Sequence, residues 1–165
     1  MTATPIAGID IDGVIADHTH RLRHLEQRPK DWSAFFADAH ADPPLPSGIA
    51  EVTRLQRLGL TIVYVSGRPT YLRDQTRSWL ARNGLPEGSI HLRPARDHRP
   101  APDMKLDIYQ ELALNFDIQA IVDDDDRVVE ALTAAGFPVI HATWYLPGQG
   151  DAATLSEAQD EEGRT

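Results

Sequence analysis

The chain has 165 residues, of which 41 % are hydrophobic, and it carries a formal net charge of −9 and no cysteine. This length and composition suit one folded domain, and they exclude a disordered polymer, disulfides and thiolate metal sites. The negative charge disfavours broad, non-specific binding to nucleic acid, although a local basic groove could still hold a polynucleotide end.

The first predicted element is a short buried strand, Ile6 to Ile9, which leads directly into two aspartates. Asp10 and Asp12 stand at positions i and i+2, so on an extended backbone both carboxylates point to the same side. Gly13 then allows the chain to turn. Two such carboxylates repel each other unless a cation or a proton lies between them, which suits a Mg²⁺ site or a nucleophile beside a proton shuttle. The alternative is an ordinary turn rich in Asp and Gly.

The segment from Ala16 to Pro46 is too short for an independent cap domain, so we expect a long loop that contains a helix. Asp31 can cap this helix, and helical spacing places three aromatic residues in the core: Trp32, Phe35 and Phe36. Three histidines suggest zinc, but their spacing matches no zinc pattern. We therefore expect solvated or loop-packed side chains at His18, His20 and His24.

The rest of the chain alternates between predicted helices and strands. Helical periodicity, caps and glycine stops predict helices over Ser47 to Gly59, Tyr71 to Asn83, Met104 to Asn115 and Val128 to Ala135. Apolar runs predict strands over Leu60 to Val65, Ser89 to Leu92, Ile118 to Val122 and Pro138 to His141. The alternation predicts a parallel sheet with helices on both faces.

Polar side chains follow three of the predicted strands. Asp10 and Asp12 come after the first strand, Ser66 and Arg68 after the second, and an acidic run beginning at Asp123 after a later one. Ligands of parallel α/β sheets bind beyond the carboxyl ends of the strands. We therefore expect these groups to form one site.

Four short motifs follow one another in the chain: Asp10-Ile11-Asp12-Gly13-Val14, Ser66-Gly67-Arg68, Lys105 and Asp123-Asp124. This ordered set resembles the motifs of the haloacid dehalogenase (HAD) superfamily of phosphohydrolases. The resemblance covers roughly residues 5 to 145. It implies an α/β fold of the HAD-like Rossmannoid type, a three-layer αβα sandwich with a central parallel sheet and no large cap domain. We expect residues 1–147 to form this domain and residues 148–165 to form an acidic, flexible tail.

A closer resemblance is to the 3'-phosphatase domain of phage-type polynucleotide kinase-phosphatases. It is carried by the stretches Ile62 to Arg68, Thr76 to Trp79, Asp97 to Arg99 and Phe116 to Asp124. Arg21 falls where that domain has an active-site arginine. Ala101 stands where it has an aspartate, and the acidic run is one residue longer. No phosphate-binding P-loop is present, so a kinase half is missing.

The resemblance implies a role for each motif residue. Asp10 would attack phosphorus and form an aspartyl-phosphate, and Asp12 would protonate the leaving oxygen and then activate water. The implied Mg²⁺ ligands are Asp10, Asp12 through its backbone carbonyl, Asp123 and Asp124. Ser66 and Lys105 would act on the phosphoryl group, and the substrate-binding set is Arg21, Ser66, Gly67 and Arg68.

Simpler interpretations stay open for several of these residues. Arg68 could pair with a neighbouring acid, and Arg21 could be an exposed arginine. Asp125 and Asp126 are expected in an exposed first turn of a helix, where carboxylates favour the helix dipole.

The leading functional hypothesis is a Mg²⁺-dependent phosphomonoesterase that removes a 3'-terminal phosphate from a DNA or RNA end. The local match and a group of basic residues favour this substrate: Arg82, Arg93, Arg96 and Arg99. The alternatives are a HAD phosphatase for a small metabolite or mononucleotide, and a catalytically idle HAD-like binding module. A separate kinase or ligase could be a partner. No apolar stretch suits a membrane span and residues Met1 to Thr4 resemble no signal segment, so we expect a cytoplasmic protein.

Overall fold

A computed structural model describes residues 2–145. Its centre is a sheet of five parallel strands in the order β3-β2-β1-β4-β5. The strands are β1 (Thr4–Ile9), β2 (Thr61–Pro69), β3 (Ile90–Arg93), β4 (Phe116–Asp123) and β5 (Val139–His141). The predicted parallel α/β fold is therefore confirmed. The expected tail at 148–165 lies outside the described residues.

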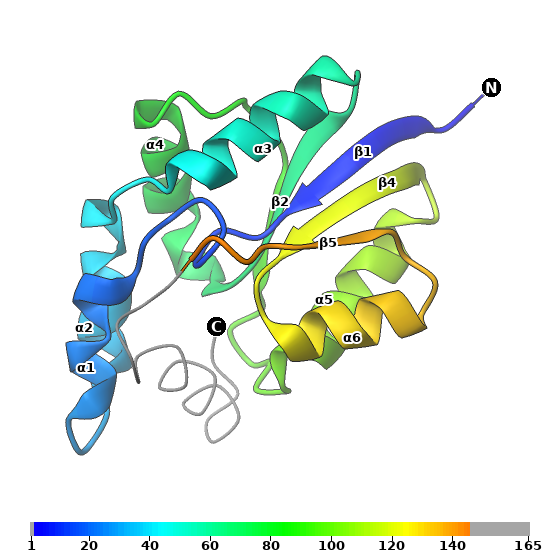
Figure 1. The fold of residues 1–165 in the computed structure, drawn as a ribbon. Coiled ribbons are helices and arrows are strands. Elements are labelled where there is room, and N and C mark those ends of the chain that lie inside the picture. The colour runs from blue at the N-terminus through cyan, green and yellow to red at the C-terminus, as the bar shows by residue number, and fades with distance from the viewer. Residues whose placement is uncertain (1, 146–165) are drawn as a thin grey trace.

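Helices cover both faces of this sheet, as Figure 1 shows. On one face, α3 (Pro46–Arg57) and α4 (Arg73–Arg82) pack Val52, Leu55 and Trp79 against the strands. On the other face, α5 (Ala101–Leu112) and α6 (Asp126–Ala134) contribute Tyr109 and Leu132 to a second core. The two cores hold β1 between them, so the residues that follow β1 start from a fixed position.

A group of short helices lies beyond the carboxyl ends of the strands (Figure 1). It consists of η1 (Thr19–Arg21), α1 (Arg23–Glu26), α2 (Trp32–Ala37) and η2 (Asp38–Ala41). As predicted, Asp31 caps α2, with its side chain accepting a hydrogen bond from Ala34 N. Trp32, Phe35 and Phe36 are buried with Leu72, which belongs to η3 (Thr70–Leu72) after β2. The segment is thus a small helical insertion fixed to the sheet by its own apolar core.

Two helix starts differ from the sequence prediction. Helix α3 begins at Pro46 with Leu45 as its N-cap, so the predicted Ser47 cap is wrong. Helix α5 begins at Ala101 rather than Met104, and part of the predicted loop is helical. Proline is tolerated in a first helical turn because the N–H it lacks has no helical partner there. Pro46 and Pro102 therefore lie in the first turns of α3 and α5.

The turn after β1 is closed by backbone hydrogen bonds. The amides of Ile15 and Ala16 both donate to the carbonyl of Ile11 at 3.0 Å. Gly13 has a φ of +81°, which residues with a side chain rarely adopt. The loop therefore returns tightly over the end of the strand. None of the described helices is long and apolar enough to cross a membrane.

Candidate active site

The predicted motif residues meet at the carboxyl edge of the sheet. Asp10 and Asp12 follow β1, Ser66 to Arg68 end β2, and Asp123 ends β4. Lys105 reaches the same place from the second turn of α5, which packs on that side of the sheet. The residues separate into two clusters, one around Lys105 and one around Arg21 and Arg68.

In the first cluster, Lys105 lies between two buried carboxylates. Its Nζ atom is 3.1 Å from Asp10 Oδ2 and donates a hydrogen bond to Asp123 Oδ2 at 2.6 Å. The other oxygen of Asp10, Oδ1, accepts a hydrogen bond from the backbone amide of Ile11 at 2.8 Å. These contacts fix the nucleophile predicted at Asp10 in one orientation.

The electrostatics of Asp10 reflect burial in a crowded acidic site. Burial raises its pKa to about 7, Lys105 acts in the opposite direction, and Asp123 and Asp12 add to the rise. Burial also raises the pKa of Asp123 and of Asp124. One lysine therefore does not compensate three neighbouring carboxylates.

Asp10, Asp123 and Asp124 can converge on one cation. Each offers a carboxylate oxygen, and these three atoms lie within 4.8 Å of one another. Gly13 makes room for this arrangement, because a Cβ atom there would lie 2.1 Å from Asp124 Oδ2. Oxygen ligands with excess negative charge suit a hard divalent cation such as Mg²⁺. The donor set thus fits Mg²⁺, and it includes three of the four acids that were predicted as ligands.

The side chain of Asp12 belongs to the second cluster. Its Oδ1 atom accepts hydrogen bonds from Arg21 Nη2 at 2.8 Å and from Arg68 Nη2 at 2.6 Å. Burial alone would raise the pKa of Asp12, but the coulombic effects of Arg68 and Arg21 outweigh burial and hold the pKa well below its usual range. Asp12 is therefore held as a carboxylate.

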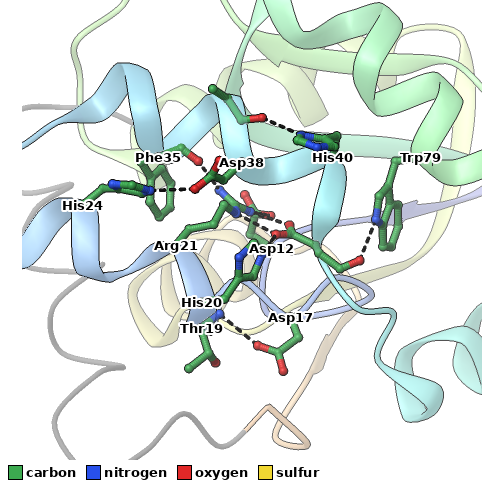
Figure 2. A network of polar contacts seen from close by, with 12 residues as sticks. Asp12, Asp17, Thr19, His20, Arg21, His24, Phe35, Asp38, His40 and Trp79 are labelled. Atoms are coloured by element: carbon green, nitrogen blue, oxygen red, sulfur yellow. Dashed lines mark hydrogen bonds and ion pairs between the residues drawn. The ribbon is translucent and has the colours of Figure 1, made fainter.

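Both arginines of this cluster are completely buried. The alternative of an exposed Arg21 is thus wrong, whereas the interpretation of Arg68 as the partner of a neighbouring acid is confirmed. Figure 2 shows Arg21 reaching toward Asp12 beside the ring of Phe35, whose centroid lies 4.4 Å from the guanidinium carbon. The phosphate contacts predicted for the two arginines stay predictions.

Asp42 completes the cluster, and the sequence analysis did not identify it. Its carboxylate accepts hydrogen bonds from Arg21 Nε at 2.7 Å, Arg21 Nη2 at 2.6 Å and Arg68 Nη2 at 3.0 Å. His20 Nε2 lies 2.8 Å from Asp42 Oδ1. Two buried carboxylates thus balance two buried guanidinium groups. An Asp before two prolines resembles an ordinary loop residue, so no local sequence signal indicated this role.

Ser66 and Gly67 lie within the last part of β2. The hydroxyl of Ser66 is buried and accepts a hydrogen bond from the backbone amide of Arg68 at 3.2 Å. This bond fixes the turn-like end of the strand from which Arg68 points toward Asp12.

The structure also bears on two other predictions, the basic group and the exposure of Asp125. Arg93 is buried and donates hydrogen bonds to the carbonyls of Asp97 and Arg99, so within the basic group it is not exposed, whereas Arg82 and Arg96 are. Arg99 itself is paired with Asp97 and Asp107. The side chain of Asp125 is only 13 % exposed and acts as the N-cap of α6, accepting a hydrogen bond from Arg127 N, whereas Asp126 is 90 % exposed in the first turn of α6, as predicted.

The three histidines do not form a metal site in the described part of the chain, where the acidic cluster is the group identified as able to bind a metal. His18 is buried, as expected for a loop-packed side chain, and its ring lies 4.8 Å from that of Tyr145. His20 pairs with Asp42, and His24 Nε2 lies 2.7 Å from Asp38 Oδ2, as Figure 2 shows for His24.

Comparison with known proteins gives a family for this site. Residues 5–143 match the family model described as "Polynucleotide kinase PNKP phosphatase domain". A curated protein of Oceanobacillus iheyensis, "Putative nucleotidase OB0422", is 30 % identical over 99 residues, which is 60 % of this chain and 47 % of that protein. The chain therefore spans less than half the length of this relative.

Solved structures share the fold at low sequence identity. A chain in the structure of the Pnkp1/Rnl/Hen1 complex has a TM-score of 0.70 and 17 % identity, with 86 % of this chain and 46 % of that chain covered. The class C acid phosphatase from Bacillus anthracis has a TM-score of 0.63 and 18 % identity, with 97 % and 80 % covered. Because the family model spans most of the residues and the four motifs meet in one site, the chain belongs to the family of PNKP phosphatase domains, which are phosphatases of the HAD superfamily.

Proposed function

We propose that this chain is a Mg²⁺-dependent phosphomonoesterase that forms an aspartyl-phosphate at Asp10 and removes a terminal 3'-phosphate from a polynucleotide. The observation that carries the proposal is the division of the site into two clusters. Asp10 lies with Lys105 and the acidic group, whereas the neighbouring Asp12 is held apart by two arginines. This division supports Asp10 as the attacking carboxylate and Asp12 as the group that transfers protons.

Asp10 must be ionised to attack phosphorus. Its pKa of about 7 in the absence of a cation would leave it partly protonated near neutral pH. Lys105 favours the ionised form, and Mg²⁺ bound to Asp10, Asp123 and Asp124 would supply further positive charge that screens the approach of an anionic phosphate. Attack of an Asp10 oxygen forms the new O–P bond while the bond to the leaving oxygen breaks.

Asp12 would then take a proton from the water that hydrolyses the aspartyl-phosphate. Its ionised state, held by Arg21 and Arg68, suits this second step. The first step needs a protonated Asp12 to donate to the leaving oxygen. A substrate phosphate that draws one of the two guanidinium groups away from Asp12 would raise the affinity of Asp12 for a proton. Binding and proton transfer are coupled in this proposal.

A terminal 3'-phosphate is favoured as the substrate by the family match. The Pnkp1/Rnl/Hen1 RNA repair complex contains a chain similar to this one, 42 % of which is covered, and this supports a separate kinase or ligase partner for this chain. The second candidate is a mononucleotide or small phosphate ester. It is favoured by the relative named as a nucleotidase and by the net charge of −9.

A substrate panel tests the proposal. Phosphate release is measured from a generic aryl phosphate, 3'-phosphorylated DNA and RNA oligonucleotides, 3'- and 5'-mononucleotides and sugar phosphates, each with Mg²⁺ and with EDTA. We expect Mg²⁺-dependent turnover with the largest kcat/KM on an oligonucleotide. Equal or better use of small phosphates would replace the first candidate with the second. No turnover of any substrate would favour an idle binding module.

Asp10→Asn isolates the chemical step. The amide keeps the shape of the side chain but loses its nucleophilicity, so turnover should fall below detection while the protein stays folded. Asp74→Asn is the matched control, because the side chain of Asp74 is 95 % exposed and lies on the outer face of α4. Substantial activity of Asp10→Asn would show that another group attacks phosphorus.

A further inference from the structure

The aromatic side chains near the site differ in exposure. Trp32, Phe35, Phe36 and Trp79 are each at most 4 % exposed, so none of them offers a free face to a ligand. Tyr71, in contrast, is 69 % exposed. Tyrosine is enriched at interfaces, because its ring is apolar while its hydroxyl can stay in water, so an exposed tyrosine near the site is a candidate for ligand contact.

Tyr71 lies close to the site along the chain. It lies in η3, three residues after Arg68, whose guanidinium binds Asp12. Three residues of even a fully extended chain span at most about 11 Å, so the two Cα atoms lie within that distance. Leu72, the next residue, is buried with the core of α1 and α2 and fixes the backbone of η3.

A series of ring contacts also joins Tyr71 to this site. Its ring lies 6.4 Å from that of Phe36, which in turn lies 5.3 Å from Phe35. The ring of Phe35 lies below the guanidinium of Arg21, and its carbonyl accepts a hydrogen bond from Arg21 Nη1 at 3.3 Å. The exposed ring is thus linked through Phe36 and Phe35 to Arg21, which holds Asp12.

The remaining large apolar side chains that are exposed in the described part of the chain lie elsewhere. Leu58 is the C-cap of α3 and precedes β2. Leu114 precedes β4 and Phe116 is its first residue, so all three lie at the amino ends of strands. Tyr71 alone of this exposed group follows the carboxyl end of a strand, where ligands of such sheets bind.

We propose that Tyr71 is a stacking platform for the base of the nucleotide that carries the terminal phosphate. This assignment rests on the proposed function. Every base has a π-face, so stacking on a tyrosine would add affinity without demanding a particular sequence. Stacking of a base on an aromatic side chain corresponds to a change in affinity of about 5- to 150-fold. Since the base is remote from the reacting phosphorus, the effect falls on KM more than on kcat.

The test compares substrates with and without the base. KM and kcat are measured with 3'-phosphorylated oligonucleotides that end in a normal nucleotide or in an abasic residue, using the wild type, Tyr71→Ala, Tyr71→Leu and Tyr71→Phe. We expect Tyr71→Ala to raise KM about 10-fold for the base-bearing end and to leave the abasic end unchanged. Tyr71→Phe keeps the ring and should behave as the wild type. Tyr71→Leu lacks the ring, so its KM for the base-bearing end should rise almost as much as that of Tyr71→Ala.

Phe116→Ala is the matched control, because it removes a 37 % exposed ring at the opposite end of the sheet. It should leave KM unchanged for both the base-bearing and the abasic oligonucleotide. An equal rise for both substrates would overturn the proposal in favour of a packing role beside Phe36. No change for either substrate would overturn it as well.

A failure of the proposed function would be recognised separately, because the wild type would then turn over neither oligonucleotide. In that case the same variants are compared on a nucleoside monophosphate and on ribose phosphate. If the ratio of the two KM values approaches one in Tyr71→Ala, the stacking role is kept. If the ratio is the same as in the wild type, the stacking role is ruled out.

Discussion

At the residue scale, Asp42 shows how a site can depend on a group that never meets the reacting atoms. It contributes a second carboxylate to the two arginines that hold Asp12. Without it, two buried guanidinium groups would share one carboxylate. A buried charge without its partner is costly, and the arginines would be expected to shift toward Asp12 or toward water.

We therefore predict that Asp42→Asn lowers both stability and activity. Loss of one partner of a buried pair should lower the free energy of unfolding by about 3 kcal/mol. Displacement of Asp12 by even about 1 Å should lower kcat/KM on the order of 100-fold. Urea unfolding and steady-state kinetics measure the two effects.

Asp38→Asn is the control for this variant. Asp38 also pairs with a histidine and an arginine, His24 and Arg23, but this pairing lies at the exposed surface. Its kcat/KM should match that of the wild type. If Asp42→Asn kept wild-type kinetics, the arginine cluster would be a stability feature without a role in positioning Asp12.

At the scale of elements, the sequence predicted the core elements better than their ends. Period and composition located β1, β2, β4 and α3 correctly, because buried strands and amphipathic helices impose their own residue pattern. The start of α5 was predicted at Met104 instead of Ala101, although Pro100 and Pro102 suit the beginning of a helix. Helix α1, only four residues long, has no pattern that distinguishes it from a loop.

The turn after β1 gives a prediction at this scale. Gly13→Ala would strain a backbone with φ of +81° and would push against the carboxylate of Asp124 at the end of β4. Gly59→Ala is a matched control, because Gly59 has a φ of +86° and nothing within 4 Å of a Cβ atom there. Each should lose about 1 kcal/mol of stability from backbone strain, but only Gly13→Ala should also lose Mg²⁺ affinity and turnover.

Calorimetric titration with Mg²⁺ alone separates the two glycine variants without relying on activity. Equal Mg²⁺ affinity in Gly13→Ala and the wild type would mean that Asp124 does not take part in metal binding. Loss of affinity in both variants would instead indicate a general effect of backbone strain.

At the scale of the whole molecule, the order of motifs predicted which residues meet, but not how their charges are shared. Asp10, Lys105 and Asp123 were expected together, and they are together because parallel strands end at one edge. The sharing of Arg21 and Arg68 between Asp12 and Asp42 depends on how the insertion folds back over the sheet. Such contacts between distant segments leave no local pattern.

The end of the described chain also returns to the first loop. Trp144 Nε1 donates a hydrogen bond to the carbonyl of Val14 at 2.8 Å, and the hydroxyls of Tyr145 and Thr19 are 2.8 Å apart. These contacts enclose His18, whose ring packs on Tyr145. The segment after β5 thus stabilises the loop that joins Asp12 to Arg21.

This enclosure predicts a pH dependence of stability. Burial lowers the pKa of His18 to about 4 from an ordinary value of 6.5, an effect only partly opposed by Asp12. Between these two values the unfolded chain binds the proton and the folded chain does not, so the free energy of unfolding falls as the pH drops through this range. His18 should account for about 3 kcal/mol of the loss between pH 6.5 and 4. Urea unfolding at a series of pH values should therefore give a steeper loss for the wild type than for His18→Asn, even if the variant is less stable at pH 7.5. Parallel curves for the two proteins would show that folding does not lower the pKa of His18.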